Sequence, residues 1–220
     1  MESDMKGLLD RITAEFAKSK AKLESLRQQK VDEYQGRQDR LALFEKACES
    51  LKGVWRPRLE GLKQAFGDKV QLRPQVETGR RQAEFSFTSN LAQIGLAFTA
   101  ATDVDVRNLV LEYSLTIVPV LLSYPDKARL EQPLDRIDPK ATGAWIDDRI
   151  VEFVKTYLSL HENEYYLKPH MVEDPVARVR FPKFAAASTL ERGGKTLYFI
   201  SSLTREQFEA KEGADRRSAG

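Results

Sequence analysis

Eight apolar residues between positions 41 and 66 recur at steps of three or four, and this regularity constrains the fold more than any other feature of the chain. Because an α-helix has 3.6 residues per turn, this spacing places all eight on one stripe. They are Leu41, Phe44, Cys48, Leu51, Trp55, Leu59, Leu62 and Phe66. We expect this helix to bury its stripe against the chain's own sheet. Pro57 should bend it near Gly53 and Val54, and Gly67 should end it.

A less regular helical run precedes this one. Its apolar residues, separated by Lys, Glu, Gln and Arg, are Leu9, Ile12, Phe16, Leu23 and Leu26. The stretch 28–40 between the two runs is almost wholly polar and contains Gly36, so both a helical hairpin and one long kinked helix are compatible with it. An unbroken helix over residues 8–66 would be about 90 Å long, more than the rest of the chain could cover. We therefore expect the five residues of the first run to contact a partner, either a second copy in a coiled coil or another protein.

From Val70 the apolar period changes to two, which is typical of a sheet with one buried face. We expect antiparallel strands near residues 70–76, 83–88, 94–100 and 109–117, and a short edge strand near 127–132. Asp138 and Pro139 are typical of a helix start. The apolar face of that helix, predicted to pack across the sheet, is Ile146, Ile150, Phe153, Val154, Tyr157 and Leu160. The predicted fold class is α+β: long N-terminal helices, an antiparallel β-meander with a packed helix, and a small C-terminal hairpin and helix unit.

The composition narrows the class of protein. Hydrophobic residues make up 41% and charged residues 31%, which is typical of a folded chain. Lys and Arg (35) exceed Asp and Glu (33) by only two and are interspersed with them, so no anionic partner is required. The longest apolar stretch, 115–122, is much shorter than the roughly 20 residues of a membrane span. A single cysteine, Cys48, rules out an internal disulfide. We expect a soluble, cytoplasmic protein without a membrane partner.

The C-terminal sequence resembles a YHS domain. The resemblance rests on Asp174-Pro175-Val176-Ala177-Arg178-Val179, on Ala185 and Ala186, on Gly194-Lys195-Thr196-Leu197-Tyr198-Phe199-Ile200-Ser201-Ser202, and on Phe208. The family begins with a D-P-V-C-G-M type motif and continues through G-K-x-Y-Y-F-C-S to a further cysteine. This chain has Ala177, Ile200 and Thr204 where the family often carries cysteine, and Arg178 and Val179 where it has Gly and Met.

The resemblance implies a small hairpin and helix unit over residues 172–211. Members with cysteines are associated with heavy metals, for which thiolates are good ligands. Without thiolates we expect a metal-free module. A unit this small normally needs a staple or a neighbour, so we expect it to dock on the preceding helix or sheet. The residues expected to be buried are Val176, Phe181, Leu197, Phe199 and Phe208.

Other candidates for chemistry are weak. His161, His170 and Asp174, with nearby glutamates, form the only His and carboxylate cluster in the sequence, but their spacing matches no recognised metal site. Asp147 and Asp148 are adjacent on a helix and point about 100° apart, so they cannot act as an acid and base pair. No nucleophile elbow, P-loop or dinucleotide motif is present. We expect no catalytic residue, no cofactor and no enzymatic activity.

These observations divide the chain into helices (1–67), a sheet with a helix (68–165), the YHS-like unit (172–211) and a flexible tail (212–220). The hypothesis they favour is a non-enzymatic interaction or scaffold protein. One alternative is a copper or zinc trafficking or sensing protein. A further alternative is a nucleic-acid-binding accessory protein, although acidic residues interrupt its basic surface. That surface consists of Lys18, Lys20, Lys22, Arg27, Lys30, Arg37 and Arg40.

Overall fold

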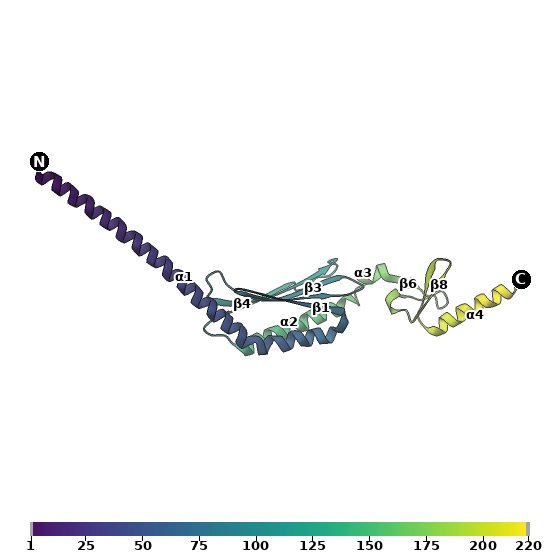
Figure 1. Ribbon diagram of the computed structural model, residues 1–220. Helices are drawn as coiled ribbons and strands as arrows, with labels where there is room; N and C mark the ends of the chain where they lie inside the picture. The colour runs from purple at the N-terminus through teal and green to yellow at the C-terminus, as the bar shows by residue number, and fades with distance from the viewer. Residues whose placement is uncertain (1, 219–220) are drawn as a thin grey trace.

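The chain forms an elongated α+β structure with a long helix at one end, a sheet covered by helices in the middle and a small unit at the other end (Figure 1). The computed structural model describes the backbone of residues 2–218 and the side chains of residues 5–211 and 213. The predicted fold class is confirmed.

The two N-terminal helical runs form one continuous helix, α1 (Glu2–Phe66), which passes through Gly36 without a break. The hairpin alternative is therefore wrong. The helix bends as it passes onto the sheet (Figure 1), and Pro57, which has no N–H to donate to the Gly53 carbonyl, lies in the part that packs there. A 3₁₀ turn, η1 (Gly67–Lys69), follows α1 and leads into the first strand.

Five antiparallel strands form a meander in which each strand pairs with the next along the chain. The strands are β1 (Val70–Glu77), β2 (Arg80–Phe87), β3 (Gln93–Thr102), β4 (Asn108–Val118) and β5 (Lys127–Pro133). The register places large apolar residues opposite each other, as in Phe98 with Tyr113 and Ile94 with Ile117. The predicted alternation is also present, because Glu112 and Ser114 of β4 are exposed whereas Tyr113 is buried.

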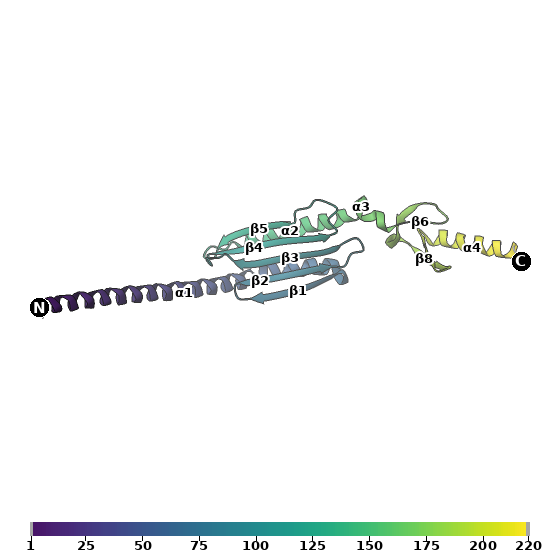
Figure 2. The ribbon, with the colours of Figure 1, turned by 90° about the horizontal axis from the view of Figure 1, so that it is seen from above.

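One face of the sheet is covered by the last third of α1 and by α2 (Pro139–Leu160), which lie side by side (Figure 2). Asp138 caps α2 by accepting hydrogen bonds from the N–H groups of the first turn, as predicted. Phe153 is fully buried, with its ring 4.7 Å from that of Phe87. Phe44 and Leu51 of α1 are also fully buried, and they belong to the same core cluster as residues of the sheet. Residues 1–67 therefore do not form a separate unit.

The end of α2 leads through α3 (Glu164–Leu167) and a 3₁₀ turn, η2 (Lys168–His170), to the C-terminal unit. Tyr166 anchors this connection: its hydroxyl donates to the Pro119 carbonyl (2.6 Å) and accepts from the Leu121 N–H (3.0 Å). The elements of the unit are β6 (Met171–Glu173), β7 (Arg180–Pro182), η3 (Lys183–Ala185), β8 (Ser188–Arg192), β9 (Lys195–Phe199) and α4 (Ser202–Ser218).

The C-terminal unit does not dock on the sheet, contrary to expectation. It lies beyond the end of the sheet (Figure 2), and no described residue after Leu167 belongs to the buried core of the central domain. Phe181 and Phe199 are buried as predicted, but within the unit itself. The flexible tail expected from residue 212 is helical as far as Ser218, and residues 219 and 220 lie outside the described part of the chain.

Candidate functional site

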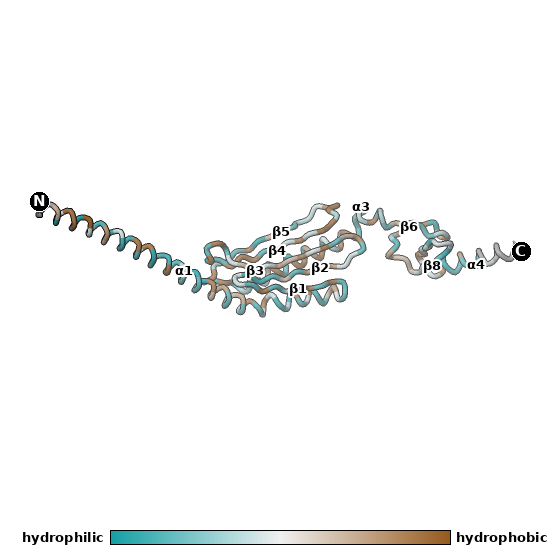
Figure 3. Tube along the Cα trace, turned by 45° about the horizontal axis from the view of Figure 1, so that its top comes forward, coloured by the Kyte–Doolittle hydropathy of each residue, from teal (hydrophilic) through white to brown (hydrophobic). Residues whose placement is uncertain are grey.

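A series of exposed apolar side chains lies on the first part of α1, residues 5–40, which we call the arm. The arm projects away from the sheet (Figure 3), and its five predicted interaction residues are all exposed. Their exposed fractions are 57% for Leu9, 43% for Ile12, 72% for Phe16, 67% for Leu23 and 54% for Leu26. Among the described helices, including the 65 residues of α1, none carries an apolar stretch that could span a bilayer. The apolar stripe of the arm has no cover within the described chain.

Local pairs of side chains support the arm as a helix. The Lys18 ammonium lies 2.8 Å from the Glu15 carboxylate, and Lys30 lies 2.7 Å from Glu33. Such exposed pairs contribute roughly 0.3–0.5 kcal/mol each. At the base of the arm, the Arg40 Nε donates to the Asp105 carbonyl oxygen at 3.1 Å. These short-range pairs support the helical structure of the arm, and the Arg40 hydrogen bond attaches its C-terminal end to the loop that contains Asp105.

The apolar residues of the arm follow the spacing of a coiled-coil seam. Steps of three and four alternate through residues 9, 12, 16, 19, 23 and 26, which correspond to successive a and d positions of a heptad. The sequence prediction omitted two members of this seam. Ser19 occupies a d position, and Met5, which is 62% exposed, extends the seam by one step of four towards the N-terminus. The alternating steps could have identified both.

A concave surface beside the sheet was not predicted from the sequence. A cavity of about 640 Å³ is lined by residues of α1, of α2 and of strands β1 to β4. Its apolar wall includes Trp55, Leu59, Leu72, Phe98 and Trp145, which come from four different elements. Its charged rim is neutralised locally, because Arg81 pairs with Glu45 and Arg56 pairs with Glu60. The cavity can admit an apolar group.

Cys48 lies in the wall of this cavity and is 5% exposed. Burial raises the pKa of its thiol to about 12, because loss of solvent disfavours the thiolate more than the nearby Arg81 favours it. The thiol is therefore protonated near neutral pH and is a poor nucleophile. This agrees with the interpretation of Cys48 as a buried residue of the helix stripe.

The three weak metal candidates, His161, His170 and Asp174, do not form a site. His161 lies against the Tyr157 ring, with ring centroids 5.3 Å apart, and His170 lies against Phe184 at 5.9 Å. Within the described residues, no group of three or more His, Cys, Asp or Glu side chains is placed to hold a metal ion.

Asp174 instead organises the C-terminal unit. Its side chain is fully buried; one carboxylate oxygen accepts from the N–H groups of Val176 (2.7 Å) and Ala177 (2.9 Å), and the other accepts from Ile200 N–H at 2.9 Å. Burial favours the neutral acid, but these donors and the Thr204 side chain outweigh it and hold the pKa of Asp174 below its ordinary value. The carboxylate therefore joins the start of the unit to the end of β9.

The positions at which YHS proteins often carry cysteine converge on this carboxylate. Ala177 and Ile200 donate their N–H groups to Asp174, and Thr204 is a further hydrogen-bonding neighbour. Arg178 occupies the family's glycine position and has a φ of 58°, a conformation that favours glycine. The geometry of these residues is compatible with the resemblance. No protein-family model, curated protein or solved structure matches this chain, so the resemblance remains a prediction that rests on these residues alone.

Proposed function

We propose that this protein is a non-enzymatic interaction or scaffold protein that associates through its arm with the arm of a second copy. The observation that carries the proposal is the apolar stripe on the arm, which no other described part of the chain covers. A contiguous apolar surface that a protein leaves exposed commonly marks a site of interaction with another molecule. A cytoplasmic location belongs to the same proposal and is compatible with a chain whose single cysteine is buried and free.

The exposed stripe is sufficient for moderate association. Burial of a large apolar side chain contributes about 1.5–3 kcal/mol. The five side chains are on average a little over half exposed, so two arms would gain roughly 10 kcal/mol on pairing. Association itself costs about 4–15 kcal/mol in lost freedom. At the lower end of this cost the difference is about 6 kcal/mol, which corresponds to a dimer with a dissociation constant of roughly 40 μM.

The alternatives have less support. A copper or zinc role would need soft ligands, but the positions around Asp174 carry methyl, aliphatic and hydroxyl groups, and both carboxylate oxygens already accept hydrogen bonds. A nucleic-acid surface on the arm would need unpaired cations, but Lys18 and Lys30 lie within 3 Å of glutamates on the same helix. The metal and nucleic-acid alternatives therefore rank below self-association.

The test compares two double variants with the same change in charge. Phe16→Glu with Leu23→Glu places two carboxylates in the seam, whereas Ala17→Glu with Ser25→Glu places them on exposed positions away from it. Sedimentation of the full chain at about 500 μM, roughly tenfold above the dissociation constant of about 40 μM, should show mostly dimer for the parent and the control and a folded monomer for the seam variant. A monomeric parent at this concentration would contradict self-association, and equal dissociation of both variants would contradict the assignment of the interface to the seam.

A further inference from the structure

The seam of the arm is self-complementary when it is read in reverse. If a second arm runs in the opposite direction about a point midway between residues 17 and 18, each a position faces a d position of the partner. The facing pairs are Leu9 with Leu26, Ile12 with Leu23, Phe16 with Ser19, and Met5 with Lys30. A two-fold interface between identical chains needs this kind of self-complementarity.

We infer that two copies of this chain associate through their arms as an antiparallel coiled coil, with the two-fold axis between Ala17 and Lys18. This inference rests on the proposed function and specifies both the partner and its direction. Every residue of the seam from Met5 to Leu26 is exposed in the single chain and is available for these contacts.

Side-chain size favours the antiparallel direction. Phe16, the largest residue of the seam, faces Ser19, the smallest, in each of the two central layers of the antiparallel pair. A parallel pair would place Phe16 against the partner's Phe16 and Ser19 against the partner's Ser19. One layer would then be crowded and the next underfilled, whereas alternating large and small residues across facing positions fills the space evenly.

Charge beyond the apolar residues favours the same direction. The heptad continues into Lys30, Glu33 and Arg37, so a parallel pair that followed the helix would place each of these against its own copy. Like charges at facing core positions are unfavourable because they are partly desolvated there. In the antiparallel pair none of these three residues faces its own copy, and Lys30 faces the partner's Met5.

The flanking positions do not separate the two directions. In the antiparallel pair, Glu15 faces the partner's Lys22, but Lys6 faces the partner's Arg27. In a parallel pair, Glu15 faces the partner's Lys20, but Lys22 faces the partner's Arg27. Each arrangement has one attractive and one repulsive kind of pair, so the choice depends on the seam itself.

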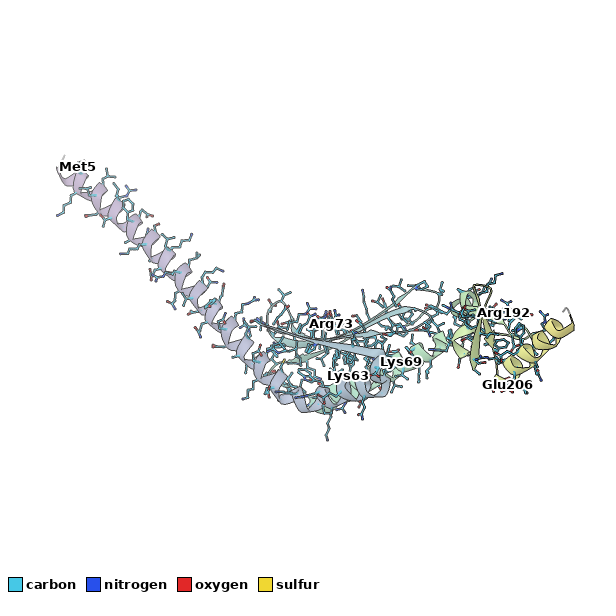
Figure 4. The ribbon with its side chains drawn as sticks, turned by 45° about the vertical axis from the view of Figure 1, so that its right-hand side comes forward. Met5, Lys63, Lys69, Arg73, Arg192 and Glu206 are labelled. Atoms are coloured by element: carbon cyan, nitrogen blue, oxygen red, sulfur yellow. The ribbon has the colours of Figure 1, made fainter. Side chains whose placement is uncertain are left out.

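The antiparallel pair would hold the two central domains far apart. The part of α1 that packs on the sheet begins near Leu41, which is 23.5 residues from the two-fold axis. At a rise of 1.5 Å per residue, the two domains would begin about 70 Å apart at opposite ends of the paired arms. The extension of the arm away from the sheet in Figure 4 allows this arrangement without contact between the domains.

Spin labels on the full chain test the direction of pairing. Gln35→Cys places a label on the exposed part of the arm, and the buried Cys48 thiol should not react, which labelling of the parent protein checks. In the antiparallel pair, two labels at position 35 should be about 50 Å apart by pulsed electron paramagnetic resonance, whereas a parallel pair would hold them within about 20 Å. Ala21→Cys is the matched control, because labels there should be about 25 Å or less apart in either direction.

The outcomes separate this inference from the proposed function. A short distance at position 21 with a distance near 50 Å at position 35 supports the antiparallel pair. Short distances at both positions would overturn the inference but leave self-association intact. No dipolar signal from either variant at about 500 μM, roughly tenfold above the dissociation constant of about 40 μM, would overturn both and leave the arm to a different protein.

Discussion

Replacing Asp174 by Asn tests whether one carboxylate holds the C-terminal unit together. The two oxygens of Asp174 accept three backbone N–H groups, from Val176, Ala177 and Ile200, at 2.7–2.9 Å. An amide of the same size has only one oxygen, so its NH₂ group must face at least one backbone donor. We therefore expect Asp174→Asn to lose one charge-assisted bond, about 1.5–3 kcal/mol, and Asp174→Ala to lose all three, about 3–5 kcal/mol.

Asp138→Asn is the matched control for this change. Asp138 caps α2 through a single oxygen, which accepts from Lys140 N–H (2.8 Å) and Ala141 N–H (3.1 Å). Asparagine is as good an N-cap residue as aspartate, so this variant should change stability by less than about 0.5 kcal/mol. The contrast between the two Asp→Asn variants separates the buried two-oxygen role from a simple cap.

Amide hydrogen exchange is the measurement. Protection at residues 176, 177 and 200 should fall in Asp174→Asn, and protection of the sheet around Tyr113 should not change, because the unit lies outside the core of the central domain. The pKa of Asp174 is depressed in the folded state, so its contribution to stability is complete above the ordinary carboxyl pKa and is lost as pH falls through the folded pKa. The variant should lack this acid-dependent loss. Unchanged protection at the three amides would refute the reasoning.

Four further predictions follow from the same geometry. Phe199→Ala should remove about 3–5 kcal/mol from the C-terminal unit and leave exchange protection around Phe153 unchanged; loss in both regions would contradict their separation. Arg178→Gly should raise the denaturant concentration at which the C-terminal unit is half unfolded, because it relieves about 1 kcal/mol of backbone strain, whereas Arg178→Ala should not. Cys48 should react with a thiol reagent at pH 8 only on unfolding, since its pKa is about 12; rapid reaction of the native protein would contradict this. Elemental analysis should find no stoichiometric copper or zinc, and one metal per chain would favour the metal alternative.

The sheet and α2 could be predicted because a period of two or of 3.6 directly determines which residues share a face. Leu96, Tyr113 and Leu115 are buried on the predicted face, and Phe153 lies on the predicted stripe of α2. The stripe from Phe44 to Phe66 also packs on the sheet as expected. In each case the pattern extends over several turns or strand residues, so single exceptions do not alter it.

The cavity beside β1 and the role of Asp174 could not be predicted in the same way. The cavity is lined by residues from α1, α2 and four strands, so no single stretch of sequence contains all of its walls. Asp174 precedes a proline and looks like an ordinary turn residue. Its third partner, Ile200, is 26 residues away in the sequence, so this hydrogen bond is visible only in three dimensions. We expected the unit to dock on a neighbour for stability because the sequence did not reveal this internal bond.

The continuity of α1 through Gly36 has a physical explanation, of which only a part could be predicted from the sequence. A glycine inside a helix costs about 1 kcal/mol relative to alanine, which is too little to impose a turn. A hairpin would have to cover the first apolar run with the stripe of the second, but Phe44 and Leu51 of that stripe are fully buried against the sheet. The sheet and the hairpin compete for one surface, and the sheet offers a much larger apolar area. The arm therefore extends away from the sheet with its own stripe exposed, and our proposal is that a second copy covers it.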